Sequence, residues 1–308
     1  MASSSDRIPF AGVWPALLTP LDAARSIDID LFASHAHALL AAGCGGLTPF
    51  GTTGEGPSFS VAERRDAIDG LLARGVPAQR LLVSTSCAAL PDALALTRHA
   101  AEVGAFGALL MPPFFLKGVS DEGIVDALRW VIDPIRGSGL RIVLYHIPQV
   151  SGVALSHAVI RTLRDAYPDT IVGLKDSGCV RADSVAYARA FMPQMQVWVG
   201  NEPDLQTLGA MGSRGAVSGL ANLVPRLVHR LVAGHDRPGA AADLAKVQAL
   251  LGALEGYGLS AAIKGMLAVL SDDRRWLAVR PPLVALDERG YREIAGRVAA
   301  LGIDRASD

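Results

Sequence analysis

Residues 170–178 read Thr-Ile-Val-Gly-Leu-Lys-Asp-Ser-Gly, a short apolar run that ends abruptly in a lysine and a carboxylate. Residues 142–144, Ile-Val-Leu, form a similar run earlier in the chain. Neither run alternates strictly, which is typical of parallel strands covered on both faces. Each is followed by a turn signal and then by a segment whose apolar residues recur at helical spacing. The pattern predicts parallel strands that alternate with helices.

The alternation of predicted strands and helices extends from these two runs over most of the chain. The expected strands are Gly12–Leu18, Gly46–Phe50, Arg80–Thr85, Ala108–Met111, Arg141–Ile147, Thr170–Lys175, Gln196–Gly200 and Gly215–Ser218. The expected helices between them are Asp30–Ala42, Val61–Arg74, Pro91–Val103, Asp121–Ile135, Ser156–Ala166, Arg181–Phe191 and Pro203–Met211. A doubly wound sheet usually has fewer strands, so we expect a (β/α)8 TIM barrel, an α/β fold.

After Asn222 the strand signals stop. Four helical patterns follow, over Pro225–Ala233, Ala240–Leu254, Ser260–Leu270 and Glu288–Leu301. We therefore expect a catalytic barrel over residues 1–222 and a C-terminal helical appendix over residues 223–308.

The composition excludes several classes of protein. Half of the 308 residues are hydrophobic and the mean hydropathy is +0.31. The apolar stretch 103–116 is nevertheless interrupted by glycine and proline, whereas a spanning helix needs roughly 20 apolar residues, so no membrane is expected. The net charge is -1 without a basic run, which argues against nucleic acid as a partner. An odd cysteine count and a polar start predict a cytoplasmic protein.

Lys175 is the first candidate for chemistry, because barrel active sites lie at the carboxyl ends of the strands. The chain has few lysines and many arginines, yet it places a lysine here. A neutral lysine amine can condense with a ketone to form a Schiff base, which then accepts electrons from a breaking bond. The alternative interpretation is that Lys175 only pairs with Asp176 or another carboxylate at the rim.

Two further segments place polar groups at strand ends. Tyr145 lies on a predicted strand, where its phenol can move protons inside a barrel; alternatively, it packs in the core with its hydroxyl on a carbonyl. Residues 51–56, Gly-Thr-Thr-Gly-Glu-Gly, form a turn whose N–H groups and hydroxyls can converge on a small carboxylate, or an ordinary connection between strand and helix.

Taken together, these segments closely resemble the signatures of the dihydrodipicolinate synthase and N-acetylneuraminate lyase family. The resemblance rests on residues 51–55 (Gly-Thr-Thr-Gly-Glu), 145–148 (Tyr-His-Ile-Pro) with 151–152, and 173–176 (Gly-Leu-Lys-Asp). Residues 216–219 with 221–222 resemble the last strand of that family. The order and spacing agree from about Ile8 to the C-terminal helices.

This resemblance implies a Schiff-base lyase or aldolase. Lys175 would bind the keto carbon of pyruvate or another 2-oxo acid, Tyr145 would be the acid–base group, and Thr52 would relay its proton. Thr53, with neighbouring backbone N–H groups such as that of Gly51, would hold the carboxylate, and the backbone of Val217 would contact the same ligand. The family needs no metal and no organic cofactor, and it forms homodimers or homotetramers, with residues 114–115 at a subunit contact.

Two positions depart from the biosynthetic synthase of this family. Phe115 replaces a tyrosine that a neighbouring subunit contributes, and Val150 replaces an arginine that binds the second substrate's carboxylate. We therefore expect cleavage or dehydration of a 2-oxo-3-deoxy sugar acid or a related hydroxy-oxo acid. The alternatives are the synthase reaction, which condenses pyruvate with aspartate semialdehyde, and a non-catalytic paralogue that only binds a 2-oxo acid.

Weaker expectations concern four neighbouring residues. His146 should point away from the barrel interior because side chains alternate along a strand. Asn201 and Glu202 follow a strand, where they either reach substrate hydroxyls or favour the next helix start. Cys179 has no evident activating partner, so we expect a passive thiol.

Overall fold

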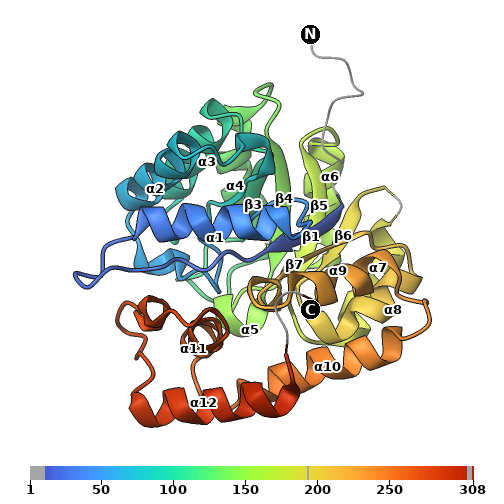
Figure 1. Ribbon diagram of the computed structural model, residues 1–308. Coiled ribbons are helices and arrows are strands. Elements are labelled where there is room, and N and C mark those ends of the chain that lie inside the picture. Colours follow the sequence, from blue (N-terminus) through green and yellow to red (C-terminus); the bar gives the residue numbers. More distant parts are fainter. Residues whose placement is uncertain (1–10, 193, 304–306) are drawn as a thin grey trace.

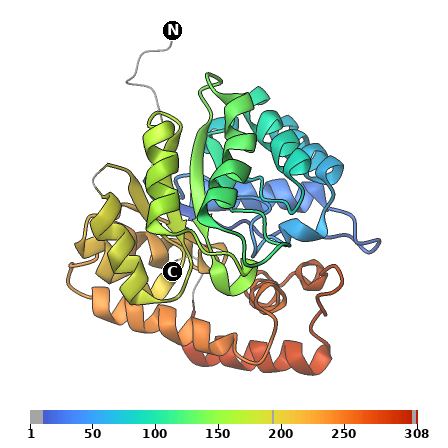
Figure 2. The same cartoon turned by 180° about the vertical axis from the view of Figure 1, so that it is seen from behind.

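The structure is a computed structural model that describes residues 11–192, 194–303 and 307–308. Its centre is a curled parallel sheet in the order β1-β7-β6-β5-β4-β3-β2, surrounded by helices (Figures 1 and 2). The strands are β1 (Gly12–Pro15), β2 (Leu82–Ser84), β3 (Gly107–Leu110), β4 (Arg141–His146), β5 (Ile171–Asp176), β6 (Gln196–Val199) and β7 (Gly215–Ser218). The α/β class is confirmed, and the ends of each strand lie within two residues of those expected, except that β1 ends three residues before Leu18.

The expected strand Gly46–Phe50 is the exception, so the prediction of eight regular strands is wrong for the described residues. This segment makes only isolated parallel bridges, from Thr48 to Ala16 and from Leu47 to Leu81. Pro49 has no N–H to donate, and Phe50 adopts a φ of 60°, which ends an extended segment. The bridges still connect the two edges of the sheet, because Ala16 follows β1 and Leu81 precedes β2.

The described helices include a counterpart of every predicted one, together with the short α5, which was not predicted. They are α1 (Ile29–Ala41), α2 (Val61–Ala73), α3 (Leu90–Glu102), α4 (Asp121–Ile132), α5 (Pro148–Ser151), α6 (His157–Ala166), α7 (Arg181–Phe191), α8 (Leu205–Ala210), α9 (Pro225–Ala233), α10 (Ala240–Ala253), α11 (Leu259–Ser271) and α12 (Glu288–Leu301). Ser60 and Glu63 form a capping box at the start of α2, where each side chain accepts from the other residue's N–H. The helix expected over Pro203–Met211 is shorter because residues 202–204 form a 3-10 turn.

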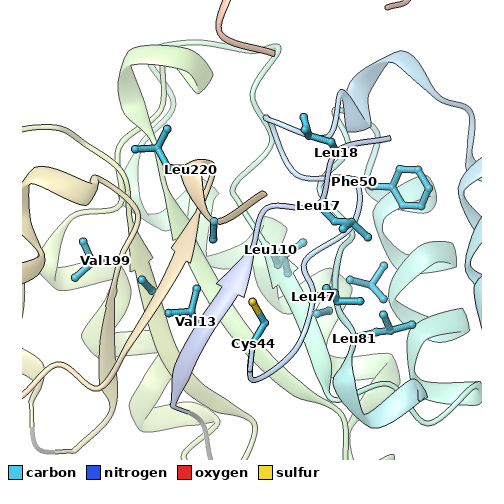
Figure 3. Packing of buried hydrophobic residues seen from close by; sticks show 14 of the residues in the cluster. Val13, Leu17, Leu18, Cys44, Leu47, Phe50, Leu81, Leu110, Val199 and Leu220 are labelled. Atoms are coloured by element: carbon cyan, nitrogen blue, oxygen red, sulfur yellow. The ribbon is translucent and has the colours of Figure 1, made fainter. Parts of the chain in front are cut away.

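The hydrophobic core has two parts. The larger lies between the sheet and the helices and includes Val13, Leu47 and Leu110, shown in Figure 3. The smaller contains Trp14 and Trp198 together with Tyr145 and Val217, with the two indole centroids 5.7 Å apart. Glycines make room for the indoles: a Cβ at Gly215 would lie 2.4 Å from Trp198.

The C-terminal helices α10, α11 and α12 pack on one another and lie on the side of the sheet from which α5 departs (Figure 1). Since α5 directly follows β4, this is the side of the strands' carboxyl ends. In the part of the chain that the structure describes, no helix is both long and apolar enough to cross a membrane.

Candidate active site

Lys175 and Tyr145 are neighbours in the sheet. They are partners in the register of the parallel strands β5 and β4, and both are almost fully buried, with exposed fractions of 4% and 1%. Paired residues of adjacent strands face the same side of a sheet. Here the Lys175 Nζ lies 4.1 Å from the centroid of the Tyr145 ring. Their strands therefore hold an amine and a phenol together at the carboxyl ends.

Thr52 completes a hydroxyl pair with Tyr145. Its Oγ1 lies 3.2 Å from the Tyr145 hydroxyl, and either atom can be the donor. The turn that carries Thr52 is tightly constrained: a Cβ at Gly56 would lie 1.9 Å from the Phe50 carbonyl oxygen, and one at Gly54 would lie 2.4 Å from that of Leu17. The glycines of this turn are therefore required by close backbone approach.

A cavity of about 230 Å³ connects these groups. Thr52, Thr53, Tyr145, Lys175 and Val217 all line it, so five of the six predicted site residues lie together. The other lining residues are Ala16, Ile147, Gln149, Val150, Ser177, Cys179, Gly200, Asn201, Glu202, Gly219, Leu220, Leu251, Leu259 and Ile263. The sixth predicted residue, Gly51, instead lines an adjacent cavity of about 180 Å³, together with Thr52, Met111 and Phe114.

Lys175 does not pair with Asp176. The Asp176 oxygens accept from the N–H of Gly178 at 2.9 Å and from the hydroxyl of Ser184 at 2.5 Å. With residues 11–192, 194–303 and 307–308, the Lys175 side chain forms no hydrogen bond and no ion pair. Gly200 leaves space for the amine, since a Cβ there would lie 3.0 Å from the Lys175 Cε. The amine therefore lines the cavity and does not form an ion pair with Asp176.

His146 lies on the other face of β4 from Tyr145, as strand alternation predicts. It is buried, and its Nδ1 accepts from the Leu155 N–H at 3.1 Å. Burial lowers the pKa of His146, while the nearby carboxylate of Asp176 opposes that shift. It does not line the cavity, which agrees with a structural histidine.

The polar residues after β6 are tied down by their neighbours. Glu202 accepts from the Ser218 hydroxyl at 2.7 Å and from the Leu220 N–H at 3.2 Å. The Asn201 amide donates to Asp204 at 2.7 Å. These contacts brace the end of β7, so Glu202 both lines the cavity and shapes it. Cys179, also in the lining, has a pKa that burial raises, which agrees with a passive thiol.

Several cavity residues were not predicted. Ser177 lies two residues beyond Lys175, and its hydroxyl is buried without a hydrogen-bond partner in the described part of the chain. The alternation of side chains along β5 is the signal that could have found it, because Ser177 and Lys175, two residues apart, face the same side. Leu251, Leu259 and Ile263 come from the C-terminal helical region, and no local pattern announced their place in the cavity wall.

The outer end of the cavity is apolar. Val150 lines both cavities and is 59% exposed, while Phe115 and Leu116 are 78% and 69% exposed. Lys175 is the only cation that lines the main cavity within the described ranges, and no arginine does so. A ligand's second anionic group would therefore find no cationic partner in this lining. The same ranges contain no cluster of three or more His, Cys, Asp or Glu placed to hold a metal ion.

Comparisons with known proteins agree with this geometry. The sequence model of the dihydrodipicolinate synthetase family matches residues 9–301. A DapA-like lyase of Chloroflexus aurantiacus, itself uncharacterised, is 32% identical over 94% of this chain and 95% of its own length. A 4-hydroxy-tetrahydrodipicolinate synthase of Rhizobium meliloti is 34% identical over 71% of this chain and 72% of its own.

Solved structures show the same arrangement of the chain. The crystal structure of dihydrodipicolinate synthase from Agrobacterium tumefaciens superimposes with a TM-score of 0.88 at 30% identity, covering 94% of this chain and 99% of that one. A sialic acid aldolase of Ruminococcus gnavus gives a TM-score of 0.84 at 21% identity, over 98% of this chain and 99% of its own, which is a likeness of fold.

Proposed function

Because the chain belongs to the dihydrodipicolinate synthetase family, whose members are lyases, we propose that Lys175 forms a Schiff base with pyruvate or another 2-oxo acid. The observation that carries the proposal is the buried Lys175 amine, which faces the cavity beside Tyr145 and forms no ion pair with any described residue. An amine that only stabilised the fold would be expected to pair with a carboxylate, since burying an unpaired charge is costly.

The proposed reaction begins when the neutral amine of Lys175 attacks the keto carbon. The oxygen takes one proton from the amine and one from Tyr145 and leaves as water, so that a protonated Schiff base and the Tyr145 phenolate remain. In the cleavage direction, the hydroxyl on C4 loses its proton to Tyr145, the bond from C3 to C4 breaks, and its electron pair moves onto C3 and the Schiff-base nitrogen. An aldehyde leaves, C3 is protonated, and water releases pyruvate from Lys175. Thr52, 3.2 Å from the Tyr145 hydroxyl, would pass the proton onward.

The carboxylate of the 2-oxo acid would lie at residues 51–54. Thr53 is buried beside the cavity, and a Cβ at Gly219 would lie 3.4 Å from its Oγ1, so the turn and the end of β7 meet there. We assign Thr53 and the N–H groups of this turn, including that of Gly51, to the carboxylate, and the backbone of Val217 to a contact with the same ligand. This would use uncharged donors and leave Lys175 as the only cation.

For the remainder of the substrate we propose an uncharged hydroxylated chain, as in a 2-oxo-3-deoxy sugar acid or a related hydroxy-oxo acid. Asn201, Gln149 and Ser177 supply polar groups to the lining of the cavity, and Val150 and Leu259 supply apolar ones. A charge-assisted contact to a second carboxylate is worth about 1.5–3 kcal/mol, and the described lining offers no arginine for it. Synthase chemistry remains the alternative because the Rhizobium meliloti relative carries that name.

The first test is reduction of the protein with borohydride in the presence of pyruvate, followed by intact mass measurement. We expect a pyruvate-sized adduct that is absent from Lys175→Ala. The absence of an adduct on the wild-type protein would refute the Schiff base and leave the interpretation as a binding protein without catalysis.

Substrate class is tested with a panel of 2-oxo-3-deoxy sugar acids, N-acetylneuraminate and 4-hydroxy-2-oxoglutarate, with pyruvate release as the readout. Condensation of pyruvate with aspartate semialdehyde is measured in parallel. We expect pyruvate release from a substrate whose hydroxylated chain beyond the 2-oxo acid group is uncharged. Faster reaction with aspartate semialdehyde than with every sugar acid would replace this proposal by the synthase alternative.

We further infer that the seven strands and residues 47–48 together form a (β/α)8 barrel over residues 1–222, with residues 223–308 as its helical appendix. The bridges on both sides of residues 47–48 support closure. A homodimer or homotetramer in the cytoplasm is also proposed. The exposed side chains of Phe115 and Leu116 support a subunit contact, and light scattering tests it.

A further inference from the structure

A buried ion pair connects the proposed carboxylate-binding turn to the C-terminal helices. The Lys264 ammonium, on α11, donates to a carboxylate oxygen of Glu55, and both side chains are 0% exposed. The second oxygen of Glu55 accepts from the Arg280 N–H at 3.1 Å, and Lys264 also donates to the Ala278 carbonyl at 2.8 Å. Both carboxylate oxygens of Glu55 are therefore hydrogen-bonded to groups that lie more than 200 residues away in the chain.

Glu55 occupies an unusual backbone conformation. Its φ of 58° and ψ of 26° place a residue with a side chain in the left-handed region, which favours glycine. Such a conformation is unfavourable for a residue with a Cβ and persists only where the surroundings enforce it. It comes two residues after Thr53 and immediately before the Gly56 N–H, which closes the turn by donating to the Gly51 carbonyl at 3.1 Å. The ion pair thus acts at the residue that determines the path of the turn.

The same helix also reaches the cavity. Ile263, next to Lys264 in α11, lines the cavity, and its Cδ1 lies beside Gly219 at the position where Thr53 also approaches. Of these two adjacent residues of α11, Lys264 therefore binds the turn through Glu55, and Ile263 forms part of the cavity wall. A rigid helix that is fixed at Lys264 fixes Ile263 as well.

From these contacts we propose that Glu55 and Lys264 are positioning residues for the 2-oxo acid. Their ion pair holds the turn over residues 51–56 in its left-handed conformation and fastens α11 against it, so that Thr53 and the turn's N–H groups face the ligand's carboxylate. In this view the C-terminal helical region is part of the binding site. The inference rests on the proposed function, because pyruvate is the ligand used to test it.

The test variant is the double substitution Glu55→Gln with Lys264→Met, which removes both charges. Replacing a whole buried ion pair is often neutral for stability, whereas removing one partner is strongly destabilising because it leaves the other charge buried and unpaired. We expect the pyruvate concentration that gives half-maximal borohydride trapping to rise at least about tenfold, since a misplacement of about 1 Å can cost 100-fold. Trapping at saturating pyruvate should remain, because Lys175 and Tyr145 lie on strands that the pair does not touch.

Hydrogen exchange provides a readout that does not depend on activity. Amides of residues 50–58 should exchange faster in the double variant, while those of β4 and β5 keep their protection. The matched control is Arg274→Gln with Glu288→Gln, which removes an exposed pair of the same C-terminal region and should change neither readout. If the double variant does not fold, Glu55→Asp, which keeps both charges but shortens the side chain that reaches Lys264 and the Arg280 N–H, is judged by the same two measurements.

A folded variant that needs no more than about twice the wild-type pyruvate concentration and shows unchanged exchange would overturn the inference. That result differs from failure of the proposed function, in which the wild-type protein itself forms no adduct. In that case exchange at residues 50–58 still decides whether the pair holds the turn.

Discussion

The inner and outer ends of the cavity are built in different ways. The inner end, the catalytic floor, consists of Lys175, Tyr145, Thr52 and Thr53, with the lysine and the tyrosine buried on paired strands. Farther out, the apolar rim consists of Val150, which lines the cavity, and of Phe115 and Leu116, which follow Phe114 of the adjacent cavity. All three lie beyond the strands and are more than half exposed.

The difference separates two questions about function. Strand pairing fixes the distance between amine and phenol, so the floor determines the type of reaction. The rim carries both positions, Phe115 and Val150, at which this chain departs from the biosynthetic synthase, so we expect it to determine which second molecule is accepted. Changes at the floor should therefore abolish chemistry, and changes at the rim should redistribute it among substrates.

The largest effect is expected for Lys175→Arg. Arginine retains a positive charge but has no amine that can condense with a ketone. If the floor works by covalent chemistry, activity should fall at least about 1000-fold, as for other lost nucleophiles, and no pyruvate adduct should form. Activity within tenfold of wild type would mean that Lys175 acts only through its charge. Pyruvate release and intact mass are the measurements.

Tyr145→Phe should have the next largest effect, because it keeps the ring beside Lys175 and removes only the hydroxyl. Loss of an acid–base group typically costs about 100- to 10,000-fold. Thr52→Val should fall short of that loss if Thr52 only relays the proton. The matched control is Thr48→Val, since the Thr48 hydroxyl is buried without a hydrogen-bond partner among the described residues. Equal activity in Thr52→Val and Thr48→Val would remove Thr52 from the relay.

At the rim, Val150→Arg tests whether a missing cation excludes the second carboxylate. A charge-assisted contact of about 1.5–3 kcal/mol corresponds to roughly 10- to 150-fold in kcat/KM. We expect kcat/KM to rise by this factor for aspartate semialdehyde and to stay unchanged for a 2-oxo-3-deoxy sugar acid that has no second carboxylate. Val284→Arg, at another exposed apolar position, is the control. No gain in Val150→Arg would show that rim charge does not set the choice of substrate.

The sequence predicted the floor better than the rest of the cavity, and the reason is physical. Lys175 and Tyr145 lie on strands, where the apolar run, the alternation of side chains and the turn together determine where a residue points. Glu55 and Lys264 meet across 209 residues of chain, and Leu251 and Ile263 reach the cavity from helices whose packing depends on tertiary contacts. No local pattern encodes such a meeting.

The strand expected at residues 46–50 shows the same limit. Its composition suits a strand, but Pro49 and the positive φ of Phe50 leave only isolated bridges. The backbone groups of Leu47 and Thr48 still pair with the neighbouring segments, for example Leu47 N–H with the Arg80 carbonyl at 2.7 Å and Thr48 N–H with the Pro15 carbonyl at 2.8 Å. The sequence predicted the place of this segment in the sheet but not the loss of regular pairing next to the site.

The smallest effect is expected outside the cavity, at the ion pair between Glu63 of α2 and Arg280. The Arg280 guanidinium, which donates to Glu63 at 2.5 Å, lowers the pKa of Glu63 from 4.5 to about 2. A carboxyl whose pKa is lowered by folding contributes stability above the unfolded value, and this contribution is lost as pH falls from about 4.5 towards 2. Because the Glu63 side chain is 40% exposed, solvent screening limits the contribution to about 1 kcal/mol.

Glu63→Gln should therefore lower Tm at pH 7 and flatten its decline between pH 5 and pH 3, measured by thermal melts at fixed ionic strength. Glu122→Gln, an exposed glutamate in the first turn of α4, is the control. Catalytic activity at pH 7 should stay near the wild-type value, and a loss as large as that of Tyr145→Phe would contradict the separation of this surface pair from the catalytic floor.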